Sequence, residues 1–583
     1  MATDTVIQQD VHEWARKFEA ALASGDPSQV LDLIADGGMW RDILAFTWDI
    51  VSLEDISQIE AMLRDKPAKV KPRNFTVEAK AGASEGWLNF ETEFGDCTGY
   101  VRLHDGLAFT LMTALQDLSG HRGKRGKYRE LGVYDDGDAR NWLERKQDYE
   151  AQLGKEEQPY VLIVGGGQGG LALGAQLRTQ GVPFLIVDKY EKPGDQWRAR
   201  YKSLTLHDPV WFDHMPIIPF PDNWPVYTPK DRVADFLESY AKILDITFWG
   251  NTAFTSAKRN AADDGWEATV EKDGKEIILK PAHIVMATGN SGFPNIPEFD
   301  GADIFEGEQM HSSEFTSGEN YAGKDVVVIG ANNSAHDICA NLVENGIQPT
   351  MVQRSSTLIL SAAANRKAAA TMYSEEAVEA GLTTQKADLL GASMTIKMAE
   401  PHQRRNYERI AKDDADYYKR LTDAGFELDF GEDGTGLWIK YLRKGAGYYI
   451  DVGASQMIVD GRIKLRSGVG IDRLTKDSVI LSDGSELKAD IVVYATGFGS
   501  MEEWVKRLIS PEIADKIGKC WGYGSGTRGD PGPWEGELRN MWKPTAQDGL
   551  WFHGGNLQQS RFYSHYLALQ LKARFVGMDV DTF

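Results

Sequence analysis

The stretch Tyr160–Gly170, with the sequence Y-V-L-I-V-G-G-G-Q-G-G, decides the fold of this chain. Its first five residues form an apolar run rich in β-branched side chains, which predicts a buried parallel strand. Gly165, Gly167 and Gly170 follow with G-x-G-x-x-G spacing. In such a motif the first glycine permits a tight turn, the second lets the backbone approach a pyrophosphate, and the third lets helix press on strand. The helix N-terminus then offers unpaired N–H groups to the phosphates.

The residues after the glycines complete a β-α-β unit. Leu171–Leu177 is predicted as helix, with Gly181 as its left-handed C-terminal residue. A second apolar strand, Phe184–Val187, is followed by Asp188, 18 residues after Gly170. An acidic residue at about this distance binds a ribose hydroxyl in dinucleotide-binding folds. Because strand, glycines, helix, strand and acid come in order, we predict a dinucleotide-binding unit rather than an ordinary glycine turn.

A second unit of this kind begins at Lys324. Asp325–Ile329 is predicted as a strand, and Gly330, Asn332 and Ala335 follow with the spacing G-x-N-x-x-A. Asparagine replaces the middle glycine here, and it is among the residues that best tolerate a left-handed backbone. Its side chain narrows the approach to a pyrophosphate. We expect a helix from this turn to about residue 345.

The second unit has a basic residue where the first has an acid. After the predicted strand Pro349–Val352 stands Arg354, 19 residues after Ala335. Arginine is permanently charged and binds phosphate through two parallel hydrogen bonds, so it suits a ribose 2′-phosphate. The sequence therefore favours NADPH over NADH at this unit. The alternative interpretation of Arg354 is an ordinary surface charge.

Composition narrows the class of protein. The 583 residues carry a net charge of −22, which argues against nucleic acid or an anionic membrane as the main partner. No apolar run reaches 18 residues, so no transmembrane helix is expected, and the start MATDTVIQQD does not read as a signal peptide. Cys97, Cys339 and Cys520 form no C-x-x-C and no ligand cluster. We therefore expect no metal site and no redox disulfide, but free thiols in a reducing cytoplasm.

The chain before the first unit is predicted to be a separate small domain. Val11–Leu22 has the apolar spacing of an amphipathic helix, and a second short helix is expected to begin at Leu31–Ile34. Strands are expected at residues 75–79, 86–94, 98–103 and 107–114. Helices followed by a strand meander predict an α+β cone. Trp40, Trp48 and His12 are candidates for a pocket, but two core aromatics and a surface histidine are the simpler interpretation.

Several further segments resemble known families. The order of elements in residues 1–135 resembles the nuclear transport factor 2-like fold. The segment Gly194–Trp197 resembles the G-x-x-W element of flavoprotein monooxygenases. Phe305–Phe315 fits F-x-G-x-x-x-H-x-x-x-[Y/F], the identifying sequence of flavin-containing monooxygenases, and Leu206–Pro209 is similar to a stretch of the YUCCA-type enzymes. Two strands, at residues 284–289 and 491–497, end in A-T-G, as in flavoproteins that bind two dinucleotides.

The resemblance, which covers residues 158 to 583, implies the cofactors FAD and NADPH. It implies that NADPH reduces FAD, that O₂ forms a peroxide at the flavin C4a, and that one oxygen atom passes to a small organic substrate. Baeyer–Villiger oxidation and decarboxylation of a 2-oxo acid are alternatives within the class. A substrate-free NADPH oxidase or redox sensor is a third interpretation, and the missing C-x-x-C argues against a disulfide reductase.

The resemblance and the motifs together give the candidate site residues. Catalytic candidates are His207, His311 and Asn333, although a structural role is an equally good interpretation of both histidines. Residues expected to bind the cofactors are Gly165, Gly167, Gly170, Asp188, Gln196, Trp197, His207, Gly330, Asn332, Asn333, Ser334, Arg354, Thr496, Gly497, Gly554 and Asn556. The last helix, expected at Phe562–Phe575, is implied to point its N-terminus at the flavin.

The predicted fold class is α/β, with two Rossmann-type dinucleotide-binding domains after a small α+β cone-like domain. The predicted domains are the cone at residues 1–135, a linker at 136–157, an FAD domain at 158–300 and 498–583, and an NADPH domain at 301–497. A helical cap is expected as an insertion at about residues 357–455. We expect no polar site in the cone, and hypothesise that it contributes to assembly, for which a homodimer is the candidate.

Overall fold

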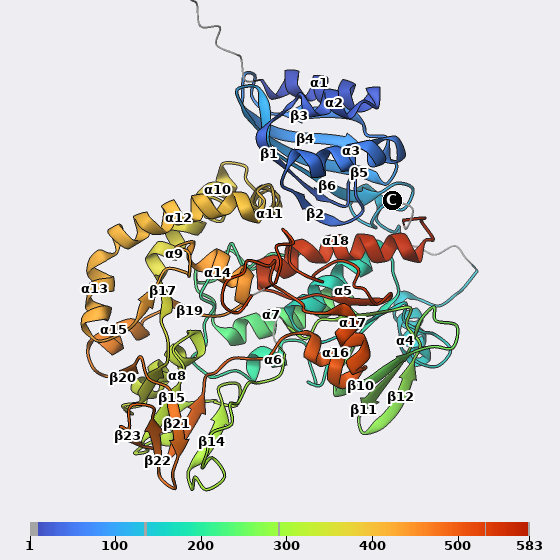
Figure 1. Cartoon of the computed structure of the whole chain (residues 1–583). Helices are drawn as coiled ribbons and strands as arrows, with labels where there is room; N and C mark the ends of the chain where they lie inside the picture. The colour runs from blue at the N-terminus through green and yellow to red at the C-terminus, as the bar shows by residue number, and fades with distance from the viewer. Residues whose placement is uncertain (1–9, 133–136, 290–291, 531, 581–583) are drawn as a thin grey trace, which may run out of the picture.

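The computed structural model describes residues 10–132, 137–289, 292–530 and 532–580 (Figure 1). The predicted boundary at residues 135 and 136 and the start of the chain lie outside these residues. An N-terminal mixed sheet is followed along the chain by two parallel five-stranded sheets. In Figure 1 the N-terminal sheet and its helices, in blue, lie over the long red helix α18 (Leu557–Phe575) near the C-terminal end.

The N-terminal sheet has six strands in the order β2-β1-β6-β5-β4-β3. Neighbouring strands are antiparallel except β1 and β6, which are parallel. The strands are β1 (Ile34–Ile43), β2 (Ile50–Leu53), β3 (Arg73–Glu78), β4 (Glu85–Glu91), β5 (Gly95–His104) and β6 (Leu107–Leu118). Helices α1 (Val11–Ser24), α2 (Pro27–Leu31) and α3 (Ile56–Val70) contact this sheet or one another. The predicted meander of four strands is confirmed.

One predicted helix in this region is wrong. The helix α2 ends at Leu31 instead of beginning there, because Asp26 caps its first turn and Pro27 occupies its first position. The strand β1 then begins at Ile34. Three apolar residues at positions 31, 33 and 34 were too few to distinguish a helix from a strand. The strand β1 and the helix α3 were not foreseen.

The inside of the N-terminal domain is an aromatic core. Trp40 is fully buried, and its indole Nε1 donates to Thr113 Oγ1 at 2.8 Å. Its ring meets Phe46 edge-on with the centroids 5.0 Å apart. Trp48 is also buried. His12 is only partly buried, and its Nε2 lies 3.2 Å from a backbone carbonyl. The interpretation of both tryptophans as core residues is confirmed.

The second sheet is parallel, with the strand order β25-β13-β7-β8-β9. Its strands are β7 (Val161–Val164), β8 (Phe184–Val187), β9 (Phe248–Trp249), β13 (His283–Met286) and β25 (Leu550–Phe552). Helix α5 (Gln168–Gln180) follows β7, ends at Gly181 with φ 66°, and contacts both α18 and α7 (Lys230–Ile243). A small antiparallel sheet is inserted, formed by β10 (Thr252–Arg259), β11 (Trp266–Lys272) and β12 (Lys275–Leu279). The pairing of β25 with β13 returns the end of the chain to this sheet.

The third sheet is also parallel, with the strand order β14-β24-β15-β16-β20. Its strands are β14 (Glu308–His311), β15 (Val326–Ile329), β16 (Thr350–Gln353), β20 (Lys464–Ser467) and β24 (Ile491–Tyr494). Helix α8 (Asn333–Glu344) follows β15 and is contacted by α15 (Ala454–Val459). A hairpin sheet lies beyond β20, made of β21 (Ile471–Leu474), β22 (Ser478–Leu481) and β23 (Glu486–Lys488).

The segment predicted as a helical cap contains the expected helices and also a sheet. The helices are α9 (Ala362–Ala369), α10 (Glu375–Glu379), α11 (Thr384–Ala392), α12 (Ile396–Asp413), α13 (Ala415–Asp423) and α14 (Gly436–Lys444). The sheet is parallel, in the order β18-β17-β19, with β17 (Thr357–Ser361), β18 (Leu428–Asp429) and β19 (Tyr448–Asp451). These strands are two to five residues long, which is too short for a periodicity to indicate them.

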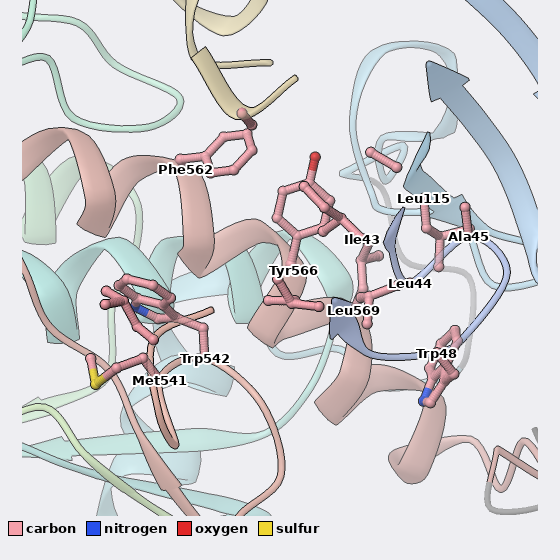
Figure 2. Packing of buried hydrophobic residues seen from close by; sticks show 14 of the residues in the cluster. Ile43, Leu44, Ala45, Trp48, Leu115, Met541, Trp542, Phe562, Tyr566 and Leu569 are labelled. Atoms are coloured by element: carbon pink, nitrogen blue, oxygen red, sulfur yellow. The ribbon is translucent and has the colours of Figure 1, made fainter. Parts of the chain in front are cut away.

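The N-terminal domain packs against α18 (Figure 2). Ile43, Leu44 and Leu115 are fully buried in one cluster with Tyr566 and Leu569 of α18. Burial of this many apolar side chains contributes about 25 cal/mol for each Å² removed from water. The domain is therefore part of the hydrophobic core of the chain, and is not an appendage on a linker.

A buried carboxylate shapes the loop that makes this contact. Asp42 is fully buried, and its Oδ2 accepts hydrogen bonds from the backbone N–H groups of Phe46 and Thr47 at 3.0 and 2.8 Å. Its Oδ1 accepts from Thr113 Oγ1 at 2.6 Å. Leu44 has φ 65°, which a residue with a side chain seldom adopts. These bonds hold the loop in the conformation that brings Leu44 to α18.

A buried ion pair joins the N-terminal domain to the C-terminal part of the chain. Arg41 and Glu537 make two parallel hydrogen bonds, of 2.7 and 2.8 Å, and both side chains are at most 8% exposed. The same guanidinium donates to Tyr563 OH on α18 and to the carbonyl of Ala392 at the end of α11. One side chain of β1 therefore holds three separate segments.

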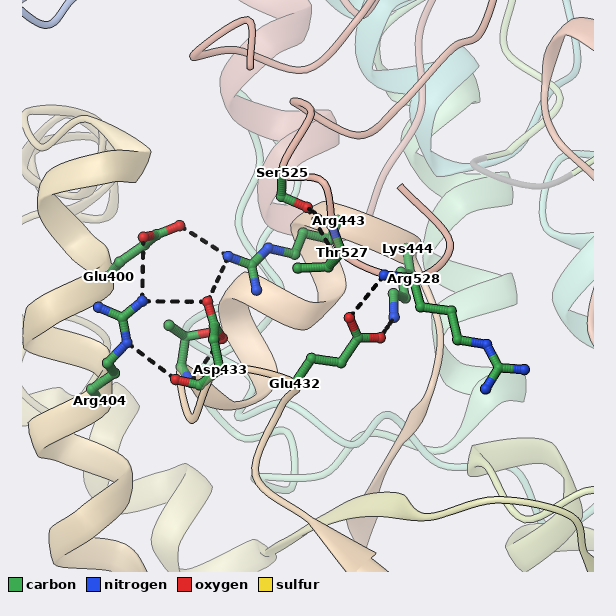
Figure 3. A network of polar contacts seen from close by, with 10 residues as sticks. Glu400, Arg404, Glu432, Asp433, Arg443, Lys444, Ser525, Thr527 and Arg528 are labelled. Carbon is green, nitrogen blue, oxygen red and sulfur yellow. Dashed lines mark hydrogen bonds and ion pairs between the residues drawn. The ribbon is translucent and has the colours of Figure 1, made fainter. Parts of the chain in front are cut away.

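A second network ties the cap to the loop before α18 (Figure 3). Arg443 on α14 donates to Glu400 Oε1 at 3.0 Å and to Asp433 Oδ2 at 2.8 Å. Glu432 bonds the Lys444 ammonium and accepts from the backbone N–H of Arg528 at 3.0 Å. Residues far apart in sequence thus hold the cap and the C-terminal segment against each other.

Substitution of Arg41 by methionine should destabilise the chain strongly. It leaves the Glu537 carboxylate buried without its partner, which costs about 3–5 kcal/mol. Thermal unfolding followed by circular dichroism measures the effect. The matched control is Arg64→Met on α3, whose partner Glu60 is also acidic but whose side chain is 69% exposed, so a change of at most about 1 kcal/mol is expected. Equal effects of the two substitutions would contradict this role of the buried pair.

Candidate active site

The glycine turn after β7 has the geometry that the motif predicts. Gly165 has φ 108°, and a Cβ there would lie 2.5 Å from the carbonyl oxygen of Ala287. A Cβ on Gly170 would lie 2.0 Å from Gly165 O, so helix and turn touch backbone to backbone. Gly167 is different, since a Cβ there would meet only Gln196 Nε2, at 3.4 Å. Nothing in the described protein therefore requires glycine at Gly167, which leaves space for a ligand.

Asp188 lies in this same turn, at the end of β8. Its Oδ2 accepts a hydrogen bond from Gly166 N at 2.6 Å, and its Oδ1 accepts from Tyr190 N at 2.8 Å. Burial raises the pKa of the Asp188 carboxyl. The sequence placed Asp188 opposite the glycines by spacing alone, and the structure brings the two together.

Buried polar atoms without partners surround the turn. Gln196 Nε2, Trp197 Nε1, Thr288 Oγ1 and Ser560 Oγ have no hydrogen-bond partner among the described residues. An unpaired buried polar atom costs about 1–3 kcal/mol, so four of them near one turn indicate a polar ligand that completes them. Gln196 and Trp197 come from the short helix α6 (Asp195–Arg198), whereas Thr288 follows β13.

The N-terminal ends of α5 and α18 meet at this place. A Cβ on Gly169 in α5 would lie 3.6 Å from Ser560 Oγ in α18. Asn556 caps α18, with its Oδ1 accepting from Gln559 N at 2.8 Å, and Gly554 is buried just before it. Two helices thus direct the positive ends of their dipoles to one region, which favours an anionic ligand.

The second glycine turn repeats the first. Gly330 has φ 127°, and a Cβ there would lie 2.3 Å from Ala495 O, as Gly165 lies against Ala287. Asn332 is the N-cap of α8 with φ −99°, which is extended backbone. The left-handed backbone that asparagine tolerates is not used here, because Gly330 supplies the positive φ of the turn. Asn333 and Ser334 form the first turn of α8.

Arg354 follows β16 directly and is exposed. It has no ion-pair partner among the residues that the structure describes, and a Cβ on Gly470 would lie 3.9 Å from its Cδ. The spacing of the second motif predicted a guanidinium at the end of β16, beside the turn at Gly330, and Arg354 lies there. Ser467, which pairs with Gln353 beside it, has a buried Oγ without a partner among the described residues.

His311, Thr496 and Gly497 lie together at the crossing between the two parallel sheets. His311 Nε2 is 2.9 Å from Gly497 O, and its Nδ1 is 2.8 Å from Ser313 Oγ. Thr496 Oγ1 donates to Asn295 O. Residues 292–295 and 497–500 run beside each other with backbone hydrogen bonds of 2.7–2.9 Å. Both ring nitrogens of His311 are thus engaged in holding this crossing.

His207 lies against α8, the helix whose first residue is Asn333. His207 Nε2 is 3.3 Å from Asp337 Oδ2, and Tyr201 OH donates to the same oxygen at 2.6 Å. Sequence reasoning missed both Asp337 and Tyr201. The signal for Asp337 was its position four residues after Asn333, on the same face of a predicted helix. No sequence signal marked Tyr201 or Ser560, whereas Thr288 belongs to the A-T-G at the end of the strand at residues 284–289.

Two negative findings apply to the described parts of the chain. There, no group of three or more histidine, cysteine, aspartate or glutamate side chains is arranged to hold a metal ion. Within the same residues, no helix is both long and apolar enough to cross a membrane.

Comparisons with known proteins agree with this geometry. The family described as pyridine nucleotide-disulphide oxidoreductase matches residues 162–431. The indole-3-pyruvate monooxygenase YUCCA1 of Oryza sativa subsp. japonica is 32% identical over 351 residues, which are 60% of this chain and 79% of that protein. The probable indole-3-pyruvate monooxygenase YUCCA3 of Arabidopsis thaliana is 32% identical over 357 residues, 59% of this chain and 74% of that protein.

Two solved structures share the fold. The complex of OTEMO with FAD and NADP has a TM-score of 0.52 at 16% identity, over 73% of this chain and 86% of that one. Cyclohexanone monooxygenase with ε-caprolactone has a TM-score of 0.51 at 18% identity, over 72% and 88%. The region matched by the disulphide oxidoreductase family contains only one cysteine, Cys339.

The two glycine turns and their parallel sheets define an oxidoreductase that binds two dinucleotides. The relatives specify it further: the chain belongs to the family of YUCCA-like flavin monooxygenases. It is an FAD- and NADPH-dependent monooxygenase. The predictions of fold class, cofactors and enzyme class are thereby confirmed.

The residues present fit both cofactors. The open Gly167, the unpartnered atoms of α6, Thr288 and Ser560, and the two converging helix ends suit FAD at the first turn. The same arrangement of strand, turn and helix at Gly330, with the unpaired Arg354, suits NADPH. When bound, FAD supplies the redox chemistry, accepting a hydride from NADPH and activating O₂. The protein binds, orients and shields these groups.

Gly167→Ala and Gly170→Ala should separate ligand binding from folding. The methyl group of Gly167→Ala fits within the protein, so the thermal midpoint of the apoprotein should stay within about 2 °C while FAD affinity falls at least about tenfold. The methyl group of Gly170→Ala collides with backbone, so this variant should lose folded protein. Flavin absorbance per polypeptide and thermal unfolding are the measurements. Gly391→Ala in α11, with open space around it, is the control, and loss of flavin there would contradict the assignment.

Proposed function

We propose that this monooxygenase inserts one atom of O₂ into a small organic substrate, at the region where the N-termini of α5 and α18 meet. The observation that carries this proposal is the set of unpartnered buried atoms beside the open Gly167, on Gln196, Trp197, Thr288 and Ser560. Ser560 of α18 is one of these atoms, which supports a position of the flavin ring next to that helix. The curated relatives named after indole-3-pyruvate indicate that a planar organic molecule is a reasonable first substrate class to test.

We assign the cofactor-binding roles as follows. Gly165, Gly167 and Gly170 with Asp188 bind the pyrophosphate and ribose of FAD, and α6 contributes Gln196 and Trp197. Gly554 and Asn556 lie at the N-terminus of α18, which we propose faces FAD. For NADPH the corresponding residues are Gly330, Asn332, Asn333, Ser334 and Arg354. We assign an indirect role to His311, Thr496 and Gly497. Their side chains or carbonyls already form hydrogen bonds where residues 292–295 cross residues 497–500, so they position the two units and do not contact the cofactor.

For the rest of the molecule, we propose the predicted domains: the N-terminal domain to residue 135, the FAD domain at 158–300 and 498–583, and the NADPH domain at 301–497. The order of helices and strands supports a nuclear transport factor 2-like fold for the first. The acidic charge of −22 supports an enzyme without nucleic-acid partners. Three cysteines without a C-x-x-C support a cytoplasmic location. A homodimer is the proposed assembly. Within one chain, the N-terminal domain already packs against α18 and supports that helix.

The function is tested with FAD-loaded enzyme reduced by NADPH without oxygen and then mixed with O₂. A delay before the oxidised flavin spectrum returns, together with ¹⁸O from ¹⁸O₂ in a product, supports the proposal. Immediate reoxidation with one hydrogen peroxide per NADPH, whatever organic substrate is present, would overturn it in favour of an NADPH oxidase.

Arg354→Gln should reduce the preference for NADPH. Loss of charged hydrogen bonds to the 2′-phosphate costs about 1.5–3 kcal/mol, which raises the KM for NADPH about ten- to hundredfold and leaves that for NADH unchanged. The rate of flavin reduction at varied NADPH and NADH concentrations measures this. Arg473→Gln, at an arginine on β21 that is 53% exposed and paired to Asp472, is the control. No change for either coenzyme would show that Arg354 is an ordinary surface charge, and an equal change for both would contradict a contact with the 2′-phosphate.

A further inference from the structure

A tyrosine of the cap takes part in capping α18. Asn556 is the N-cap residue of this helix, and its Oδ1 accepts from Gln559 N at 2.8 Å. Tyr441 of α14 joins this pair, because its hydroxyl donates to Gln559 Oε1 at 2.6 Å and accepts from Asn556 N at 3.1 Å. The side chains of Tyr441 and Gln559 are both buried. The N-terminus of α18 is therefore held from a segment more than one hundred residues earlier in the chain.

A buried ion pair holds the same turn from a second helix of the cap. Asp388 of α11 accepts two hydrogen bonds of 2.8 Å from Arg561 and one of 3.2 Å from Gln558 Nε2. Tyr373, which is also in the cap, donates its hydroxyl to Asp388 Oδ1 at 2.8 Å. Asp388 is 3% exposed and Arg561 is 7% exposed. Because separation would leave two buried charges without partners, the pair keeps α11 and α18 in place.

Arg561 also joins α18 to the first dinucleotide-binding unit. Its Nη1 donates to the backbone carbonyls of Phe212 and His214, at 2.8 and 2.5 Å. The ring of Phe212 meets that of Tyr373 edge-on, with the centroids 5.0 Å apart. The first turn of α18, the cap and residues 212–214 are thus connected through one guanidinium.

Another side of the same turn has a polar atom without a partner. With about 3.6 residues per turn, Ser560 points away from the side that Gln558 and Arg561 share. Its Oγ is buried without a partner among the described residues, 3.6 Å from the position of a Cβ on Gly169. The backbone N–H groups of Leu557 and Gln558 have no carbonyl four residues back within the helix, as at any helix N-terminus. The cap therefore engages one side of the turn and leaves these groups to a ligand.

We propose that Tyr441 and Asp388 are positioning residues for the flavin, which fix the first turn of α18 so that its N–H groups and Ser560 face the isoalloxazine ring. This inference rests on the proposed position of FAD beside α18. Both residues act through α18 and not by contact with the cofactor. The cap, at about residues 357–455, thereby becomes part of the apparatus that sets the properties of the flavin.

The consequence of this positioning is electrostatic. A helix N-terminus carries about half a positive charge, and its effect is confined to the first turn. Reduction of a flavin by two electrons and one proton leaves a negative charge on the ring. A firmly held first turn of α18 therefore favours the reduced flavin over the oxidised form, and a loosened turn favours it less.

The test is a potentiometric titration of the FAD-loaded enzyme without oxygen, against a dye of known potential. For Tyr441→Phe we expect the ratio of reduced to oxidised flavin at a fixed potential to fall about three- to tenfold, which corresponds to about 15–30 mV for two electrons. Asp388→Asn should lower the potential in the same direction, and Tyr441→Phe decides the matter if Asp388→Asn does not fold. Thermal unfolding measures the loss of stability of each variant separately.

Tyr418→Phe is the matched control, because Tyr418 is also a buried tyrosine of the cap, and its hydroxyl donates to Ile359 O at 3.1 Å, away from α18. This variant should lose some stability and keep the wild-type flavin potential. A wild-type potential in Tyr441→Phe, or an equal shift in Tyr418→Phe, overturns the positioning role. Failure of the wild-type enzyme to retain FAD would instead overturn the proposed cofactor site. The titration needs neither O₂ nor substrate, so its outcome is separate from the test of oxygen insertion.

Discussion

Backbone contact at two glycines is the constraint on which the rest of the structure depends. Gly165 lies against the carbonyl of Ala287, and Gly330 lies against that of Ala495, each too close for a methyl group. In both units the partner belongs to the A-T-G end of the neighbouring parallel strand. In each unit, therefore, the glycine motif and the A-T-G motif, which are far apart in sequence, form the two sides of one contact. This contact puts the helix N-terminus and the strand end together, which creates the site for a dinucleotide pyrophosphate.

The N-terminal domain contributes to this site through α18. That helix has one end beside Gly169 and its later turns in the hydrophobic cluster with β1 and β6. Arg41 of β1 donates a hydrogen bond to Tyr563 of α18. Arg561, also on α18, makes two hydrogen bonds of 2.8 Å to Asp388 on α11. The position of α18 is therefore set from both the N-terminal domain and the cap. An assembly role alone does not account for that arrangement.

The sequence was most informative where chemistry and spacing coincide. Both glycine motifs, Asp188 and Arg354 could be placed because a nucleotide imposes fixed distances along a β-α-β unit. Contacts between distant segments gave no such signal: the pair Arg41–Glu537 and the bond from Tyr201 to Asp337 join residues more than one hundred positions apart. The sequence also could not show which residue of the second turn has positive φ; in the structure it is Gly330, whereas Asn332 is extended.

The two units are connected by two different kinds of contact, which explains how they act together. The crossing of residues 292–295 with 497–500 is backbone to backbone, and it is tightened by His311. The contact of Asp337 with Tyr201 and His207 is made of side chains, at distances of 2.6 and 3.3 Å. The first contact therefore joins the two units through their backbones, whereas the second joins them through side chains.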